Sequence, residues 1–205
     1  IVPMHTFGFP CRIDEIIEVA AKFNIPVIED SAESLGSFYK GKHTGTFGLA
    51  GIFSYNGNKT ITTGGGGMIV TDSEEFARKA KHISTTAKVQ HPYEFIHDDI
   101  GYNYRMPNVN AAIGVAQMEY LDRILDNKKE TQRAYAEFFN ESEFQLRTQS
   151  DNTIANYWLN TLELTEIANK EEFLKDASEA GIMARPIWSL MTELPMFKNS
   201  MCGEI

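Results

Sequence analysis

Hydrophobic positions in the first two-thirds of the chain alternate between a helical and a strand period. Apolar residues recur every three or four positions from Ile13 to Ala20, which predicts an amphipathic helix. Apolar runs at 27–28, 49–55 and 68–70 predict three short strands. Alternating helices and strands are typical of an α/β layer, so we expect a mainly parallel sheet with helices on both faces.

Two further helices are predicted from the residues that begin them. Asp72 or Ser73 can cap a helix with two glutamates in its first turn. Pro107 suits the first turn of a long helix, and a helical pattern continues over 128–139. The elements expected after these are a strand, a helix and an extended segment, over 154–164, 170–180 and 182–188.

The order strand, helix, extended segment suggests the start of a smaller α+β domain. We therefore expect residues 1–130 to form part of a large domain, and residues 131–205 to form a linking helix and part of a small domain. The chain has 205 residues, of which 42% are hydrophobic and 23% charged, and this composition is that of a folded globular protein. Because Ile1 begins in an apolar segment and no element finishes at Ile205, we expect a piece of a longer protein.

Charge and cysteine content exclude several classes of function. The chain carries 19 basic and 28 acidic residues, a net charge of −9, and it has no basic run that could neutralise nucleic-acid phosphates. No apolar stretch reaches the ~20 residues that span a bilayer. No segment of charged and then apolar residues stands at the start, so we expect no secretion signal. Cys11 and Cys202 lie too far apart for a disulfide framework, and the five histidines are too scattered for a metal site. We expect a cytoplasmic protein with no metal, nucleic-acid or membrane partner.

Polar residues that could bind a cofactor or take part in a reaction follow two of the predicted strands. Asp30 and Glu33 come after the first strand, and Ser54 and Lys59 come after the second. Ligands of parallel sheets bind at the carboxyl ends of the strands. A carboxylate there can hold a protonated ring nitrogen, a hydroxyl can hold a phosphate, and a lysine can form a Schiff base. A cofactor with a pyridine ring, a phosphate and an aldehyde would use all three groups.

Each of these residues also has a simpler interpretation. A single lysine in a loop is usually solvated, an aspartate after a strand often caps a turn, Glu33 can be exposed, and Ser54 can be a satisfied core hydroxyl. The spacing of Ser54, Lys59 and the glycine run 64–67 favours the cofactor interpretation. The glycine run itself is not followed by Lys-Ser/Thr or by a helix, so we interpret it as a backbone turn packed close to the strand.

Four separated motifs support a specific family. They lie at Val2–Gly8, Val27–Gly36, Phe53–Gly67 and Gly101–Met106. In this order and spacing they resemble the DegT-type sugar-nucleotide aminotransferases, which are pyridoxal 5'-phosphate (PLP) enzymes of fold type I. The resemblance covers nearly the whole chain, and it implies the three-layer large domain of PLP transferases followed by the start of a small domain.

The resemblance also implies a role for each matching residue. Lys59 matches the Schiff-base lysine, and Asp30 matches the aspartate that pairs with the pyridine nitrogen. Glu33 falls where the family usually has glutamine facing the ring hydroxyl, and Ser54 matches the phosphate-binding serine. Asn103 matches an asparagine that reaches the phosphate from the neighbouring subunit, which implies a homodimer with shared active sites.

The implied reaction is transamination. Relatives that remove a sugar hydroxyl have histidine at the position of Lys59, so the lysine favours transfer of an amino group. The implied donor is glutamate, and the implied acceptor is a keto carbon of a nucleotide-linked deoxysugar. Such sugars are used in surface polysaccharides or glycans. Thr60 and Gly65 replace the asparagine and glutamate frequent in the family, which we interpret as a substrate-subgroup signal. The family's N-terminal phosphate turn and ring-stacking aromatic residue are absent from these 205 residues. A catalytically silent truncated homologue, or another same-fold PLP enzyme such as a sugar dehydratase, therefore remains an alternative.

Other polar and aromatic residues are open to two interpretations. Asn103 can be a turn residue, and Arg105 can contact sugar phosphates or pair with an acidic neighbour. Trp158 and Trp188 are expected in the core or at a domain interface rather than as substrate platforms. We interpret His5, like the other four histidines, as structural or exposed.

Overall fold

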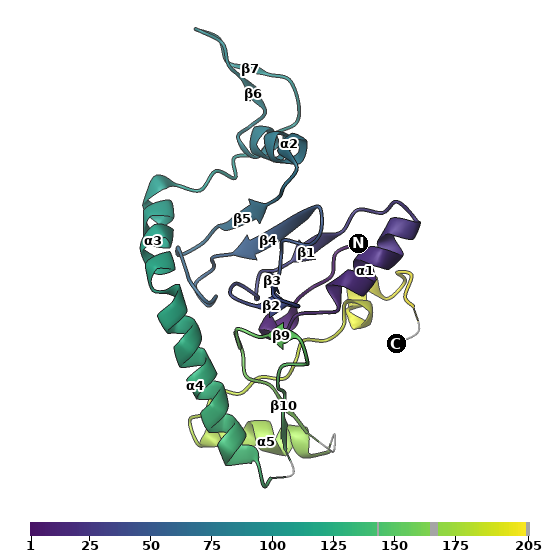
Figure 1. Cartoon of the computed structure of the whole chain (residues 1–205), viewed down its shortest axis with the longest axis vertical. Helices are drawn as coiled ribbons and strands as arrows, with labels where there is room; N and C mark the ends of the chain where they lie inside the picture. Colours follow the sequence, from purple (N-terminus) through teal and green to yellow (C-terminus); the bar gives the residue numbers. More distant parts are fainter. Residues whose placement is uncertain (143, 165–167, 204–205) are drawn as a thin grey trace.

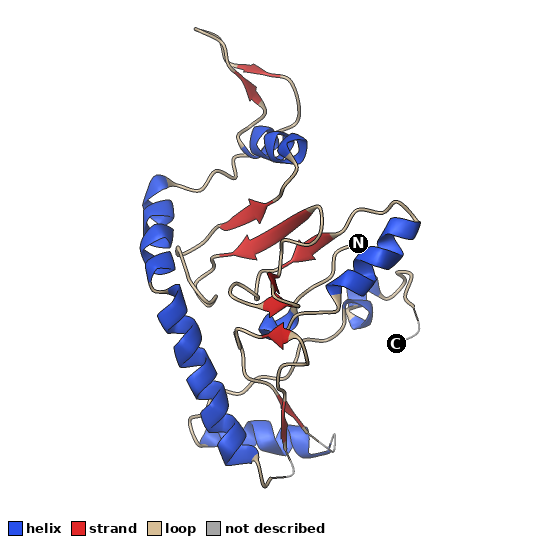
Figure 2. Ribbon diagram, viewed as in Figure 1, coloured by secondary structure: helices blue, strands red, loops and turns tan. Residues whose placement is uncertain are grey.

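The fold is built on a central mixed sheet, seen in a computed structural model (Figures 1 and 2). The structure describes residues 1–142, 144–164 and 168–203. The sheet has the strand order β1–β4–β5, with bounds Ile28–Asp30, Ala50–Ser54 and Gly67–Val70. Strands β1 and β4 are parallel, and β5 is antiparallel to β4. The carboxyl ends of β1 and β4 and the start of β5 therefore share one edge of the sheet.

Helices lie on opposite sides of this sheet (Figure 1). Helix α1 lies beside β1, and α3 and α4 follow one another along the other side (Figure 1). The helices are α1 (Ile13–Lys22), α2 (Glu74–Ser84), α3 (Asn108–Glu119), α4 (Leu121–Phe139) and α5 (Ala168–Glu179), with 3-10 turns η1 (Thr6–Gly8), η2 (Met191–Glu193) and η3 (Pro195–Phe197). The α/β arrangement predicted from the alternating pattern is confirmed.

The helix signals in the sequence are correct in kind but not in every boundary. Ser73 caps α2, because its side chain accepts a hydrogen bond from the backbone N–H of Phe76. The long helix expected after Pro107 is divided in two at Tyr120, which has φ −104° and ψ 0°. The predicted boundary at residue 130 falls within α4, and the domain division stays a prediction.

Short antiparallel pairs complete the fold. They are β2 (Phe38–Tyr39) with β3 (Lys42–His43) and β9 (Thr153–Ile154), β6 (Lys88–Val89) with β7 (Ile96–His97), and β8 (Gln145–Leu146) with β10 (Leu162–Glu163). The continuous strand expected over 154–164 is wrong. Strand β9 ends at Ile154 because the next backbone N–H groups bond to side chains: Asn156 N–H donates to Ser37 Oγ, and Trp158 N–H donates to Asn156 Oδ1.

Two buried clusters hold the elements together. One lies under α1 and contains Ile13, Ala20, Val27 and Tyr39. The other contains Phe53, Tyr55 and Ile61, against which Leu121 and Ile124 of α4 pack. Burying each valine, isoleucine or phenylalanine of these clusters contributes about 1.5–3 kcal/mol, so the clusters fix α1 and α4 on the sheet. None of the helices in the described ranges is long and apolar enough to cross a membrane.

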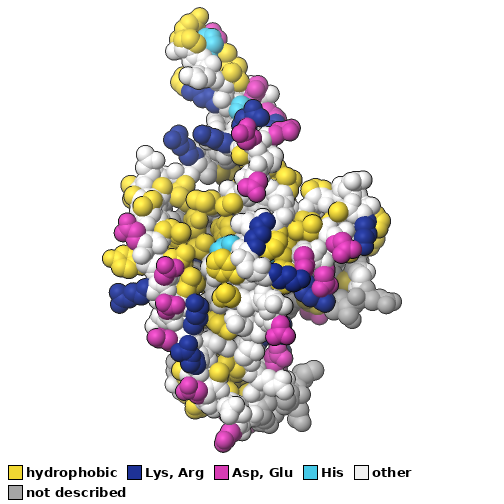
Figure 3. All heavy atoms as spheres, in the orientation of Figure 1, with side chains coloured by type: hydrophobic (Ala, Val, Ile, Leu, Met, Phe, Trp, Pro, Cys, Tyr) yellow, Lys and Arg dark blue, Asp and Glu magenta, His cyan; other side chains and the backbone are white. Residues whose placement is uncertain are grey.

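Apolar side chains also remain at the surface. Met68 and Ile69 of β5 are 51% and 48% exposed. Val109 and Ile113 on α3 are also exposed. Figure 3 shows hydrophobic side chains gathered on the face over α3 and the sheet.

Candidate functional site

Two predicted site residues lie at the shared edge of the sheet. Asp30 ends β1 and Ser54 ends β4, and the parallel register pairs Asp30 with Ile52, two residues before Ser54. Both side chains are half-buried. Asp30 Oδ1 accepts the N–H of Ala32 at 3.1 Å, and Ser54 Oγ accepts the N–H of Asn56 at 3.3 Å. The strand ends thus bring together a carboxylate and a hydroxyl that can still accept or donate further hydrogen bonds.

Lys59 lies in the loop after β4, and its amine faces a carboxylate. Lys59 Nζ is 3.6 Å from Glu33 Oε1, and the two side chains are only 14% and 8% exposed. The same Nζ lies 4.1 Å from the centroid of the Trp158 ring, within the range of a cation–π contact. The amine is therefore largely shielded from water and oriented by two different groups.

Glu33 joins this lysine loop to the beginning of the chain. Its second oxygen, Oε2, accepts the backbone N–H of Phe7 at 2.7 Å. Phe7 has φ 57°, the left-handed region that a bulky residue rarely occupies. Such strain persists only where surrounding contacts maintain it. The sequence placed Glu33 in the site but gave no indication that Phe7 holds it.

A buried carboxylate fixes the strand that carries Asp30. Glu29 is fully buried, and Oε1 accepts the N–H groups of Phe47 at 2.6 Å and Gly48 at 2.8 Å. Oε2 accepts the N–H of Gly45 at 2.7 Å. Burial raises the pKa of Glu29, but hydrogen bonds from His5 and these backbone groups outweigh it and hold the pKa below its ordinary value. The loop before β4 is therefore tied to β1 through an ionised side chain.

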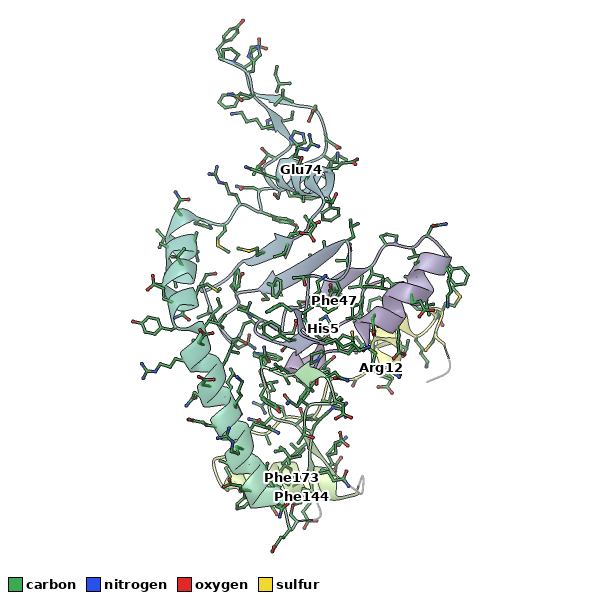
Figure 4. All side chains as sticks on the ribbon, in the orientation of Figure 1. His5, Arg12, Phe47, Glu74, Phe144 and Phe173 are labelled. Carbon is green, nitrogen blue, oxygen red and sulfur yellow. The ribbon has the colours of Figure 1, made fainter. Side chains whose placement is uncertain are left out.

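His5 completes this anchor. Its Nε2 lies 3.0 Å from Glu29 Oε2, and its Nδ1 accepts the N–H of Cys11 at 3.2 Å. Because Nδ1 is an acceptor, Nε2 carries the proton and donates to Glu29. Figure 4 shows His5 close to Phe47, next to the sheet. The structural interpretation of His5 thus agrees with these contacts.

The glycine run turns tightly against β4. Gly66 O accepts the N–H of Tyr55 at 2.9 Å, and a Cβ at Gly67 would lie 2.5 Å from Phe53 O. Gly66 has φ +104°, which favours glycine. These contacts agree with a backbone turn packed on the strand.

Asn103 lies apart from the other predicted residues. It is exposed and forms an isolated bridge with Thr85, just after α2. The N–H groups of its neighbours Tyr102 and Tyr104 donate to Ile83 O and Ser84 O. Within one chain, the described contacts do not bring Asn103 to Lys59.

Two residues beside Glu33 and Lys59, Asn156 and Trp158, were not predicted as part of the site. Trp158 is buried, as expected of a core residue, but its ring also lies against Lys59 and its Nε1–H donates to Asn58 O at 2.7 Å. Asn156 donates to Glu33 O at 2.8 Å. Both contacts span about a hundred residues, so no local spacing in the sequence could have indicated them.

Comparison with known proteins identifies related chains. The model of the DegT/DnrJ/EryC1/StrS aminotransferase family matches residues 1–204. GDP-perosamine synthase of Escherichia coli O157:H7 is 39% identical over 199 residues, covering 97% of this chain and 54% of that protein. The putative pyridoxal phosphate-dependent aminotransferase EpsN of Bacillus subtilis (strain 168) is 36% identical over 198 residues, covering 96% and 51%.

A solved structure gives the same fold. Helicobacter pylori PseC, an aminotransferase involved in the biosynthesis of pseudoaminic acid, superposes with a TM-score of 0.93 at 22% identity, covering 100% of this chain and 57% of that chain. The predicted fold class is confirmed. The chain spans about half the length of the curated relatives that it matches.

Proposed function

Because the chain belongs to the DegT/DnrJ/EryC1/StrS aminotransferase family, we propose that it forms the lysine-bearing part of a PLP-dependent sugar aminotransferase. The complete protein transfers an amino group, with glutamate as donor, to a keto carbon of a nucleotide-linked deoxysugar. The product enters surface polysaccharides or glycans. The names of the relatives, GDP-perosamine synthase and a PLP-dependent aminotransferase, support the substrate class and the cofactor.

The observation that carries this proposal is the shielded amine of Lys59. It lies 3.6 Å from the Glu33 carboxylate, in the loop that follows the strand ending at Ser54. Asp30 lies at the end of the neighbouring parallel strand. PLP requires a carboxylate for its ring nitrogen, a hydroxyl for its phosphate and an amine for its aldehyde. Asp30, Ser54 and Lys59 provide these groups, so the residues fit the cofactor.

The four side chains then have different roles. When bound, PLP supplies an aldehyde that takes up the amino group and a protonated ring that withdraws electrons from the reacting carbon. Asp30 holds the proton on the ring nitrogen, Ser54 donates its hydroxyl to the phosphate, and Glu33 faces the ring hydroxyl. The Lys59 amine would hold the cofactor between turnovers and would move a proton to and from the reacting carbon. General acid–base transfer of this kind is worth about 10²- to 10⁴-fold in rate.

The proposed assembly is a homodimer in the cytoplasm. In this arrangement Asn103, exposed after α2, extends to the phosphate held by the neighbouring subunit. Residues 1–130 contribute to the large, cofactor-binding domain, and residues 131–205 contribute the linking helix and the beginning of the small domain.

Covalent trapping tests the site. The purified chain is titrated with PLP, reduced with borohydride and mapped by peptide mass spectrometry. We expect one predominant adduct, on the peptide that contains Lys59. Lys59→Arg should abolish it, whereas Lys22→Arg, at an exposed position on α1, should leave it unchanged.

Adducts distributed over surface lysines in proportion to their exposure would contradict the proposal for this chain, and would favour a catalytically silent homologue. Trapping on Lys59 is followed by an assay of the protein from the full reading frame. Glutamate and a panel of nucleotide-linked keto sugars are supplied, and 2-oxoglutarate is measured. Loss of a sugar hydroxyl with release of ammonia, and with no amino group retained on the sugar, would instead indicate a dehydratase.

A further inference from the structure

We propose that Asn156 and Trp158 are positioning residues that hold Lys59 and Glu33 in place for the cofactor. This inference rests on the function proposed above, and it concerns a segment far from the site motifs in sequence. Residues 156–158, named here the 156–158 clip, follow β9, where the chain leaves the strand pairing with β2.

The amide of Asn156 fastens the turn that carries Glu33. Asn156 is 1% exposed, and its Nδ2 donates to Glu33 O at 2.8 Å and to Leu35 O at 2.9 Å. The same group lies 3.3 Å from the hydroxyl of Thr60, next to Lys59. One buried amide therefore connects the turn after β1 with the loop after β4.

Trp158 fastens the lysine itself. Its indole Nε1–H donates to Asn58 O at 2.7 Å, which fixes the backbone on the N-terminal side of Lys59. Its ring face lies 4.1 Å from Lys59 Nζ. The backbone N–H of Trp158 in turn donates to Asn156 Oδ1 at 2.8 Å, so the two clip residues form one unit.

The backbone of this unit is strained and closely packed. Tyr157, between the two residues, has φ 50°, and a non-glycine residue is strained there. Gly8 approaches so closely that a Cβ would overlap the Asn156 amide. Contacts with three earlier segments of the chain maintain this arrangement, whereas a packing residue at the start of a small domain would need only an apolar surface.

The consequence for the site is a fixed amine. Lys59 Nζ is oriented by two groups, which are the Glu33 carboxylate and the Trp158 ring. The 156–158 clip positions both of these groups. A side chain held in this way loses less conformational freedom when it binds a cofactor than a free surface lysine would. Residues beyond position 150 thereby act on the chemistry of residue 59.

Competitive amine labelling of the cofactor-free chain tests the clip. Traces of acetic anhydride are added at pH 8, and the labelling rate of Lys59 is expressed relative to that of exposed Lys22 by mass spectrometry. Trp158→Leu removes both the ring and the indole N–H, so Lys59 should label roughly three- to thirty-fold faster, the range expected from losing a cation–π contact. Trp158→Phe keeps a ring face and should restore part of the protection.

Lys128 provides a matched internal control. Its Nζ donates to the backbone oxygen of Trp158 at 3.3 Å, and burial lowers its pKa. A change confined to the Trp158 side chain should leave the labelling of Lys128 unchanged, whereas general loosening of the segment would accelerate both lysines. Asn156→Asp keeps the size and the Oδ1 acceptor but loses the two N–H donors. Like Trp158→Leu, it should increase the labelling rate of Lys59.

The outcomes separate this inference from the proposed function. Equal labelling of Lys59 in the parent chain and in Trp158→Leu would overturn the clip, even if PLP is trapped on Lys59. A parallel rise at Lys59 and Lys128 in both Trp158 variants would also overturn it, because the segment would then be merely structural. Failure to trap PLP in the parent chain would contradict the function while leaving the labelling ratios to report on the clip.

Discussion

Replacing Glu29 with glutamine tests the anchor beneath the site. The carboxylate is fully buried, and its two oxygens accept from three backbone N–H groups and from His5. Glutamine has nearly the same shape but only one oxygen. Its NH₂ group must face either the N–H groups of Phe47 and Gly48, or the N–H of Gly45 and the Nε2–H of His5. Either orientation leaves two buried donors without an acceptor.

The magnitude follows from these contacts. A buried donor that loses its acceptor costs about 1–3 kcal/mol, so two of them cost roughly 2–6 kcal/mol. Total stabilities of folded domains are about 5–15 kcal/mol. For a chain of this size, 1 kcal/mol shifts the melting temperature by about 2–4 °C. We therefore expect Glu29→Gln to lower Tm by roughly 5–20 °C at pH 7.

Denaturant unfolding at several pH values supplies the assay. Because the folded-state pKa of Glu29 is lowered, its contribution to stability is fully present above the unfolded-state pKa, near 4.5, and is lost as the pH falls through the folded-state pKa. The stability difference between the parent and Glu29→Gln should be constant above about pH 5.5 and should narrow below about pH 4.5. Glu15→Gln, at an exposed position of α1, serves as the control and should change stability by less than about 1 kcal/mol.

Two results would refute this reasoning. One is a destabilisation by Glu29→Gln no larger than that of Glu15→Gln. The other is a stability difference that is the same at pH 7 and pH 4, since the effect would then not depend on the charge of Glu29.

Three further changes test other parts of the fold. Gly8→Ala places a Cβ on Asn156 at φ +89° and should destabilise the chain by about 2–5 kcal/mol in denaturant unfolding; a loss below 1 kcal/mol would contradict the close approach. Ser73→Ala removes the cap of α2 and should cost about 0.5–2 kcal/mol, with Ser73→Asp restoring most of it. Burial raises the pKa of Cys11 to about 11, so at pH 8 roughly 0.1% of it is thiolate, and iodoacetamide should alkylate exposed Cys202 well before Cys11; equal rates would contradict the burial.

Local signals in the sequence were sufficient for the elements that position Asp30 and Ser54. The helical period from Ile13 predicted α1, and short apolar runs predicted β1 and β4. Parallel strands that pair side by side end at one edge of the sheet, so the expectation of a parallel sheet was enough to place the carboxylate and the hydroxyl at the same edge. The motifs around them also identified the family, which the match over residues 1–204 confirms.

Other features depended on contacts that no local pattern records. The break at Tyr120 and the end of β9 fall inside segments whose hydrophobic pattern continues without interruption. At β9, side chains from elsewhere in the fold take the N–H groups that a strand would use. Tertiary hydrogen bonds replaced strand pairing there, because a buried N–H group needs an acceptor and here that acceptor belongs to a side chain.

The sequence by itself indicated α1, α2, the three strands of the central sheet and the family, and it singled out Asp30, Ser54 and Lys59 as candidate site residues, because these inferences depend on residues that lie near one another in the chain. Only the tertiary structure decided which groups surround the lysine amine. Asn156 contacts Glu33 across 123 positions, and Trp158 contacts Asn58 across 100. Such contacts form only when the chain folds and buried polar atoms find partners, and a single sequence carries no periodic trace of that pairing.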